Sequence, residues 1–286
     1  NEACRASVLR YADEWKKYVD RVGRWVEYDN AYKTMDNTFI ESVWWGLERI
    51  HDKGRLYEGR KVLMYCPHCE TPLAKAEIAM DNTYKDVTDE TATVKFKLTD
   101  PVKNGLPENT YVLAWTTTPW TLPGNVALAV GVEIVYGIYE KDGENLIAAK
   151  ELSESLGLGE AKHELTGQAL LGAEYEPLYK ITKVAAHPGK KWLILPADFV
   201  TTTDGTGVVH TAVIYGEDDY QLGVKEGLPM VPILNPNATY NDDAPAFLHG
   251  KYIKKAEVDI KNDLEERGLL FARENYVHSY PHCYRC

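Results

Sequence analysis

Residues 115–125 read Trp-Thr-Thr-Thr-Pro-Trp-Thr-Leu-Pro-Gly-Asn. The β-branched residues near the start are typical of a strand, and Pro119 ends that strand because proline has no N–H to donate to a neighbouring strand. Hydroxyl groups therefore gather where backbone groups become free, and such a break can line a pocket. The residues alone fit equally well with three threonines that merely complete an ordinary strand.

A second segment, residues 205–220, reads Gly-Thr-Gly-Val-Val-His-Thr-Ala-Val-Ile-Tyr-Gly-Glu-Asp-Asp-Tyr. Gly205 and Gly207 allow a close approach of backbone, the strand that follows presents His210, and an acidic turn comes after the strand. On its own, such a histidine is more often a hydrogen-bonded core or surface residue than a catalytic one. The acidic turn on its own is more often a solvated helix start.

The sequence around both segments predicts a β-rich region. From Lys61 onward polar and apolar residues begin to alternate with a period of two, as they do along residues 93–98. Because proline and glycine are spread among short strands, a barrel or a mixed sheet is expected rather than a wound βαβ fold. Strands are expected at residues 93–98, 111–117, 125–139, 192–195 and 207–213, and helices at 151–156 and at 256–267 with Gly268 as the stop.

Residues 1–60 instead have the helical period of three to four residues. One amphipathic helix is expected with its apolar face along residues 8–22, and a second helix is expected after the turn at residues 34–36. The second helix is expected to start at Thr38, which stands in capping-box spacing with Glu41, and to end at Gly54. Trp44 and Trp45 are expected to be core residues.

The composition is that of a globular protein, with 286 residues of which 44% are hydrophobic, enough for about two domains. The net charge of −11 gives no global attraction to nucleic acid or to an anionic membrane, so any such contact must use a local patch. No apolar run approaches the ~20 residues of a membrane span, and the start has no signal-peptide pattern. We therefore expect a cytoplasmic protein without a membrane partner. The missing initiator Met and the terminal Cys286 suggest a piece of a longer polypeptide.

Four of the five cysteines form two CxxC pairs that bracket the β-rich region. Brought together, two such pairs make a closed Cys₄ zinc site, which is a structural site because it has no open position for water. The alternative is two unrelated turns without metal, and His68 and His282 are substitute ligands. Cys4 stands alone and is expected to be a small buried hydrophobe. The expected zinc ligands are Cys66, Cys69, Cys283 and Cys286.

Residues 115–125 and 205–220 resemble the two signature segments of the inserted editing domain, called CP1, of class I isoleucyl-tRNA synthetases. Valyl and leucyl relatives typically have Thr-Thr-Arg-Pro where this chain has Thr-Thr-Thr-Pro, so the resemblance favours the isoleucyl branch. Residues 23–26, 32–36 and 41–45 resemble the stretch of the catalytic domain that leads into the insertion, and residues 280–286 resemble the zinc knuckle that follows it.

This resemblance implies an α+β fold: a β-rich, barrel-like editing domain with a helical flanking segment and a zinc-knuckle base. The implied boundaries are residues 1–60 for the helical part, 61–80 with 276–286 for the knuckle, and 81–275 for the editing domain.

The resemblance also implies hydrolysis of the ester in Val-tRNA(Ile), or of valyl-adenylate, with isoleucine excluded by size. Asp219 would pair with the substrate's α-ammonium, and His210 would limit the size of the pocket. No Cys or Ser stands in a nucleophile motif, so direct attack by water is favoured. The other residues that would hold the ester or line the site are Thr116, Thr117, Thr118, Trp115, Asn125, Gly205, Gly207 and Tyr220.

The implied partners are the 3′ end of tRNA(Ile) carrying valine and the rest of the synthetase, and the fragment itself is expected to be a monomer. Neither ATP-binding signature of class I synthetases is present, so ATP and Mg are expected only in the full-length enzyme. One departure stands out, because Val213 and Ile214 follow Ala212 where the family usually has Ala-Pro. This departure leaves a non-catalytic tRNA-docking module with a decayed pocket as one alternative. A zinc hydrolase, in which the metal activates water, is a second alternative, although four cysteine ligands would leave no open coordination position.

Overall fold

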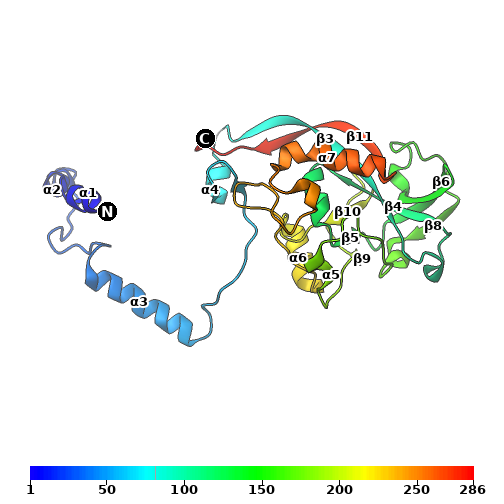
Figure 1. The fold of residues 1–286 in the computed structure, drawn as a ribbon. Helices are drawn as coiled ribbons and strands as arrows, with labels where there is room; N and C mark the ends of the chain where they lie inside the picture. The colour runs from blue at the N-terminus through cyan, green and yellow to red at the C-terminus, as the bar shows by residue number, and fades with distance from the viewer. Residues whose placement is uncertain (81) are drawn as a thin grey trace. The chain divides into compact units, whose positions relative to one another are not determined.

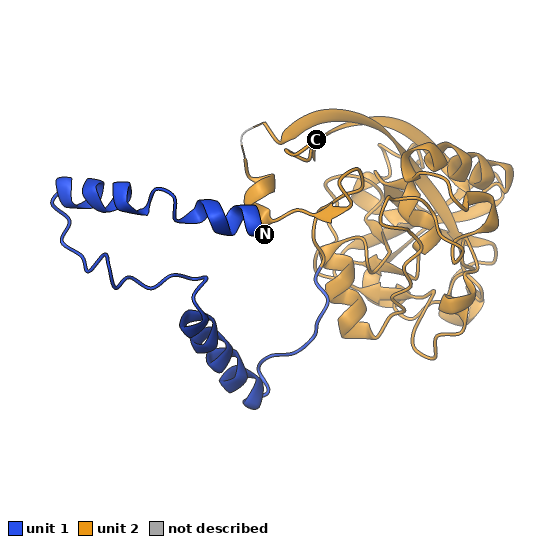
Figure 2. Cartoon of the chain, turned by 60° about the vertical axis from the view of Figure 1, so that its left-hand side comes forward, with its two compact units in different colours: residues 1–61 blue, residues 62–286 orange. Residues whose placement is uncertain are grey.

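The computed structural model describes residues 1–80 and 82–286. The chain divides into two compact units, residues 1–61 and residues 62–286 (Figure 2).

The first unit consists of three helices, α1 (Glu2–Val8), α2 (Ala12–Arg21) and α3 (Asn37–Asp52), and none of them has a buried residue. Trp44 and Trp45 are 70% and 63% exposed, so the expectation that they are core residues is wrong. The periodicity correctly indicated an apolar face, but the described part of this unit contains no second layer that covers it.

The ends of α3 test two further expectations. The helix begins at Asn37 with Asp36 as its N-cap, so the expected capping box of Thr38 and Glu41 is wrong because both residues lie within the helix. Gly54 ends the helix as expected, with φ of +65°, and its N–H donates to His51 at 2.7 Å.

The second unit contains a six-stranded sheet with the order β11-β3-β4-β7-β6-β8 and a three-stranded sheet with the order β10-β5-β9 (Figure 1). Each sheet contains one parallel pair, β4 with β7 and β5 with β9, and is otherwise antiparallel. The α+β class and the mixed sheet are therefore confirmed, whereas the described strands do not close into a barrel. The strands are β1 (Tyr65–Cys66), β2 (Thr71–Pro72), β3 (Tyr84–Lys97), β4 (Thr110–Thr116), β5 (Ala127–Val130), β6 (Val135–Lys141), β7 (Glu144–Ala149), β8 (His163–Thr166), β9 (Ile194–Pro196), β10 (Val208–Thr211) and β11 (Leu270–Pro281).

Short helices connect these strands. The helices are α4 (Lys75–Ile78), η1 (Val102–Asn104), η2 (Pro119–Gly124), η3 (Lys150–Leu152), η4 (Gly167–Leu170), α5 (Thr182–Ala185), α6 (Glu217–Glu226), η5 (Ala246–Leu248) and α7 (Ile253–Glu266). Helix α7 and its stop at Gly268, where φ is +67°, confirm the prediction for residues 256–267.

Two sequence-based expectations for this unit are wrong in detail. The single strand expected at 125–139 is two strands, because the chain leaves β5 in one sheet and enters β6 in the other. The helix expected at 151–156 is only the short η3, followed by turns. Ser153 and Ser155 donate their hydroxyls to backbone carbonyls three residues earlier, at 2.9 and 2.8 Å, which favours turns over a continued helix.

The main core lies where the two sheets and α7 meet. Ala92, Val94 and Phe96 alternate along one face of β3 and are fully buried. From α7, Ile260 and Leu264 enter the same cluster. Strands β3 and β11 also pair along most of their length as a long ribbon. None of the helices in the described ranges is long and apolar enough to cross a membrane.

Candidate functional site

A turn rich in threonine follows β4, at the break that the sequence predicts. Strand β4 ends at Thr116, and η2 begins at Pro119. The Thr118 N–H donates to Oγ1 of Thr116 at 3.0 Å, and the Thr121 hydroxyl donates to the Thr118 carbonyl at 2.8 Å. The turn therefore closes on itself and holds its hydroxyls in one place.

His210 joins β10 to this turn. Its Nε2 lies 2.8 Å from Oγ1 of Thr121. Because the Thr121 proton is used on the Thr118 carbonyl, the hydrogen-bond network assigns the hydrogen of this contact to Nε2. The ring is buried, which lowers the pKa of His210 to about 4, and its Nδ1 has no hydrogen-bond partner among the described residues. The imidazole is therefore neutral near pH 7 and presents one free acceptor.

Asp219 lies in the first turn of α6, next to the end of β10. Its Oδ1 accepts the Ala212 N–H at 3.2 Å. Burial raises the pKa of Asp219 to about 6. The hydrogen bond from the Ala212 N–H acts to lower this pKa, and the nearby charge of Asp218 acts to raise it. A methyl group at Gly216 would overlap Oδ2 of Asp219, so a side chain there would displace the carboxylate. The site thus contains a half-buried carboxylate that titrates close to neutral pH.

Several sequence-predicted residues come together, and others lie apart from them. Thr116, Thr118 and His210 belong to one hydrogen-bonded network, and Thr117 is half-buried within the same turn. Trp115 lies on the other face of β4, since successive residues of a strand point to opposite sides. Its ring packs edge-on against Tyr276, with 5.3 Å between the ring centres. Together with Gly205 it lines a separate cavity of about 640 Å³.

The structure gives internal partners to two of the predicted substrate-binding residues. The Asn125 side chain donates to Ala127 O at 2.9 Å and accepts the Tyr175 hydroxyl at 2.6 Å. Gly207 accepts the Tyr136 hydroxyl at 2.7 Å, and a methyl group on it would overlap Ala149. Both residues therefore use these polar groups within the fold, and binding of substrate by either residue stays a prediction. Tyr220 packs against the main core from α6.

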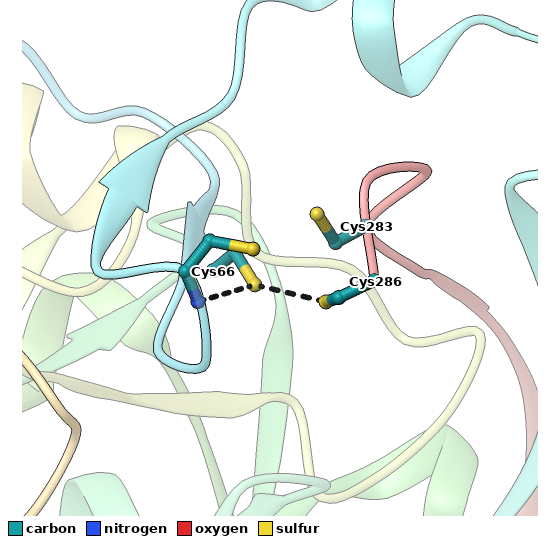
Figure 3. Close-up of side chains that lie close together, drawn as sticks. Cys66, Cys283 and Cys286 are labelled. Carbon is teal, nitrogen blue, oxygen red and sulfur yellow. Dashed lines mark hydrogen bonds between the residues drawn. The ribbon is translucent and has the colours of Figure 1, made fainter.

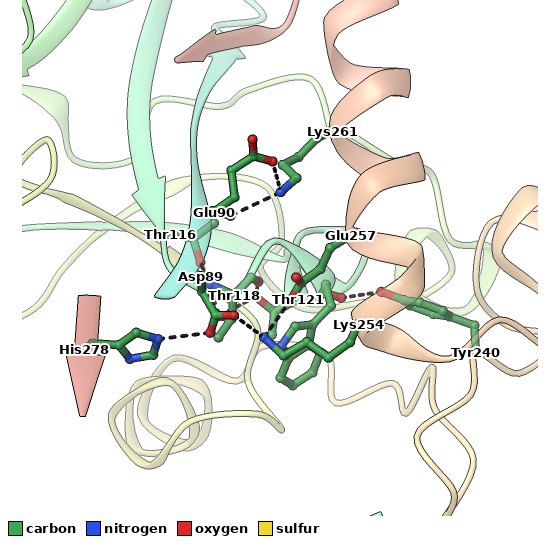
Figure 4. Close-up of polar contacts among 11 residues, drawn as sticks. Asp89, Glu90, Thr116, Thr118, Thr121, Tyr240, Lys254, Glu257, Lys261 and His278 are labelled. Carbon is green, nitrogen blue, oxygen red and sulfur yellow. Dashed lines mark hydrogen bonds and ion pairs between the residues drawn. The ribbon is translucent and has the colours of Figure 1, made fainter. Parts of the chain in front are cut away.

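Thr121 and Tyr240 also contribute to this region, although no sequence pattern assigned either of them to it. Thr121 follows Thr118 by three residues, which is the spacing of one 3₁₀ turn, and it is the link between the threonine turn and His210. The buried Tyr240 donates its hydroxyl to the Trp120 carbonyl at 2.6 Å and so holds η2 in place (Figure 4). No local pattern marks Tyr240, because its partner lies 120 positions away.

A cluster of charged residues fixes α7, on which η2 packs, to the strand β3 (Figure 4). Asp89 accepts hydrogen bonds from His278 and from Lys254, both at 3.0 Å. Burial alone would raise the pKa of Asp89, but these two hydrogen bonds lower it. Lys261 is 2% exposed and pairs with Glu90. The cluster therefore helps to hold α7 against β3, and α7 in turn packs on η2, which follows the threonine turn.

The two CxxC pairs converge within the second unit (Figure 3). All four sulfur atoms lie within 4.8 Å of one another, and Cys66 Sγ is 3.6 Å from Cys286 Sγ. Tetrahedral zinc with Zn–S bonds of about 2.3 Å requires sulfur atoms about 3.8 Å apart, so the four thiols fit a metal ion. Burial opposes ionisation of the Cys66 thiol, but hydrogen bonds from the Cys69 N–H and from Cys286 lower its pKa to about 7. Neither His68 nor His282 belongs to this group of described ligands, and Cys4 is exposed, contrary to expectation.

Residues 1–268 match the family model of class I tRNA synthetases for isoleucine, leucine, methionine and valine. The chain belongs to this family. Within it, the chain is 42% identical to the isoleucine–tRNA ligase of Treponema denticola, over 100% of the chain and 28% of that protein. It is 45% identical to the isoleucine–tRNA ligase of Clostridium novyi, over 99% of the chain and 26% of that protein. The resemblance seen in the sequence is thereby confirmed, and the chain spans about a quarter of the length of these relatives.

Among solved structures, the crystal structure of GlLeuRS-CP1 is similar to this chain, with a TM-score of 0.50. The similarity covers 64% of this chain and 99% of that structure at 15% identity, which supports a shared fold.

Proposed function

We propose that this chain is the editing part of an isoleucine–tRNA ligase and hydrolyses the ester bond of Val-tRNA(Ile). The observation that carries the proposal is the contact between Thr121 and His210, which joins the two signature segments into one site. Asp219 lies beside the same strand end through its bond to Ala212. The site combines hydroxyl groups, a neutral imidazole and a carboxylate, which is the set that the family resemblance requires.

The need for a second site follows from binding energetics. One methylene distinguishes isoleucine from valine and is worth about 1–3 kcal/mol, a general figure for which isoleucyl-tRNA synthetase is itself a standard example. A synthetic site alone therefore charges tRNA(Ile) with valine too often. A second site that admits valine and excludes isoleucine removes the error.

The residues of the site support distinct roles in this reaction. The Asp219 carboxylate attracts the α-ammonium of the valyl ester, and the contact is strong because the carboxylate is partly removed from water. His210 is neutral and bulky, so it limits the space beside the aliphatic side chain. The threonine turn offers hydroxyls and backbone groups to the ester and the terminal adenosine. Water, positioned with the adjacent ribose hydroxyl, attacks the ester carbon directly.

The four-cysteine cluster would hold zinc in a structural role. Four thiolate ligands complete a tetrahedral site, so no position remains at which the metal could activate water. This arrangement supports hydrolysis at the threonine and histidine site rather than at the metal. We propose in addition that the partners are the 3′ end of tRNA(Ile) and the rest of the ligase in the cytoplasm, where ATP and Mg serve the full-length enzyme.

The experiment that tests the proposal compares hydrolysis of Val-tRNA(Ile) and Ile-tRNA(Ile) by this chain. We expect hydrolysis of the valyl ester and little hydrolysis of the isoleucyl ester. In Asp219→Ala, most of the valyl activity should be lost while the fold persists, because the ammonium group loses its counter-charge. A folded parent protein that binds tRNA but hydrolyses neither ester would instead support the non-catalytic docking module.

A further inference from the structure

The segment that leaves β10 contacts α6 at two points. At the first point the Ala212 N–H donates to Asp219 Oδ1 at 3.2 Å. At the second, the next residue, Val213, packs against Gly223 and is only 2% exposed. Asp219 and Gly223 are four residues apart and therefore lie on the same face of α6. Two consecutive residues of the chain thus hold one face of this helix.

The contact between Val213 and Gly223 has no spare room. A methyl group on Gly223 would overlap Cγ1 of Val213 and would lie 2.8 Å from its Cγ2. Gly223 is buried in the interior of a helix, where glycine is less favourable than alanine. The close approach of Val213 therefore explains why glycine stands at this position.

We propose that Val213 and Gly223 are a positioning pair. Their contact sets the distance between α6 and the segment that follows β10, and so places the Asp219 carboxylate beside the strand that carries His210. Val213 faces α6 and the core in this arrangement. Val213 stands where the family usually has the proline of Ala-Pro. In this proposal, that departure affects the placement of α6 and does not mark a decayed pocket wall. The inference rests on the proposed function where it concerns hydrolysis, but the position of the carboxylate can be measured separately.

The test is Gly223→Ala, in which the added methyl group pushes α6 away from Val213. Asp219 then becomes more hydrated, so the midpoint of its carboxyl titration, followed by ¹³C NMR, should fall from about 6 toward its ordinary value of 3.8. The kcat for Val-tRNA(Ile) hydrolysis should fall about tenfold or more, because a small displacement spoils the alignment of the ester. The double variant Gly223→Ala/Val213→Ala removes the overlap and should restore both quantities.

A matched control is Gly137→Ala on β6, in the six-stranded sheet, where the methyl group would overlap the Tyr139 hydroxyl. This control should lower the melting temperature without moving the Asp219 midpoint. If Gly223→Ala does not fold, Val213→Ile presses on the same contact with one added methyl group.

The proposal is overturned if folded Gly223→Ala keeps the parent midpoint, or if the double variant behaves like the single one. An absence of hydrolysis by the parent protein has a different meaning. That result would refute the proposed function and leave the comparison of midpoints valid.

Discussion

His210 should make the folding stability of this protein sensitive to mild acid. The ring is buried and its pKa is lowered from 6.5 to about 4, so the folded protein binds the imidazole proton more weakly than the unfolded chain does. Stability from the neutral ring is complete above pH 6.5 and is lost as the pH falls toward 4. The full difference corresponds to about 3 kcal/mol of unfolding free energy.

The change in unfolding free energy is large enough to measure between two accessible pH values. Between pH 7.5 and pH 5, linkage to His210 should remove about 2 kcal/mol. Asp219 acts in the opposite direction, because burial raises its pKa from 3.8 to about 6, and it should return about 1 kcal/mol over the same interval. The net change in the parent protein is therefore small, and a variant is needed to isolate the histidine.

The variant is His210→Gln, which keeps an N–H donor for Thr121 but does not titrate. Urea unfolding at both pH values, followed by tryptophan fluorescence, gives the change in unfolding free energy for each protein. Acidification should lower the unfolding free energy of the parent by about 1 kcal/mol and raise that of the variant, in which only Asp219 acts, by about 1 kcal/mol. The two proteins should therefore differ by about 2 kcal/mol in their response. His163→Gln, at an exposed histidine on β8, is the control and should behave like the parent. Equal losses in the parent and His210→Gln would refute the assignment of His210 as a buried neutral ring.

Protein purified without chelator should contain about one zinc per chain, and replacing Cys286 by serine should lower that content and the melting temperature together; a folded protein repeatedly free of zinc would contradict the cluster's role. The rate of Val-tRNA(Ile) hydrolysis should rise with pH through about 6 as Asp219 ionises, and Asp219→Asn should abolish this step in the pH profile. His210→Ala should raise the ratio of isoleucyl to valyl ester hydrolysis, since an extra buried methylene gains about 0.8 kcal/mol once space is available; an unchanged ratio would show that the ring is no size limit. Gly207→Ala should destabilise the fold by more than 1 kcal/mol, measured by urea unfolding, because its φ of +73° and the overlap with Ala149 both oppose a side chain.

Local chemistry explains which parts of the fold the sequence predicted correctly. Pro119 ends β4 because proline cannot continue a ladder, and Gly268 ends α7 because its backbone adopts a positive φ. The convergence of the CxxC pairs was likewise predictable, since two such pairs together supply the four thiolates of a tetrahedral zinc site. In each case, the decisive interaction lies within a few residues or follows from metal chemistry.

The remaining features depend on contacts between distant segments. The division of residues 125–139 into two strands reflects their assignment to different sheets, which a period of two does not encode. Tyr240 reaches Trp120 across 120 positions, and no neighbouring residue marks it. The threonine turn was predictable as a break in a strand, but its link through Thr121 to His210 required the fold.

The cysteine cluster has a consequence for how such a domain can be carried by another protein. Cys66 and Cys286 are 220 positions apart in the chain, yet their sulfur atoms are 3.6 Å apart. Cys66 and Cys286 therefore lie side by side, so the whole segment between them could be inserted into a single surface loop of a host domain without separating the ends of that loop. A metal ion bound by the four cysteines would join the two ends of this segment. It would thereby restrict the unfolded segment, which lowers the entropy gained on unfolding and stabilises the folded unit.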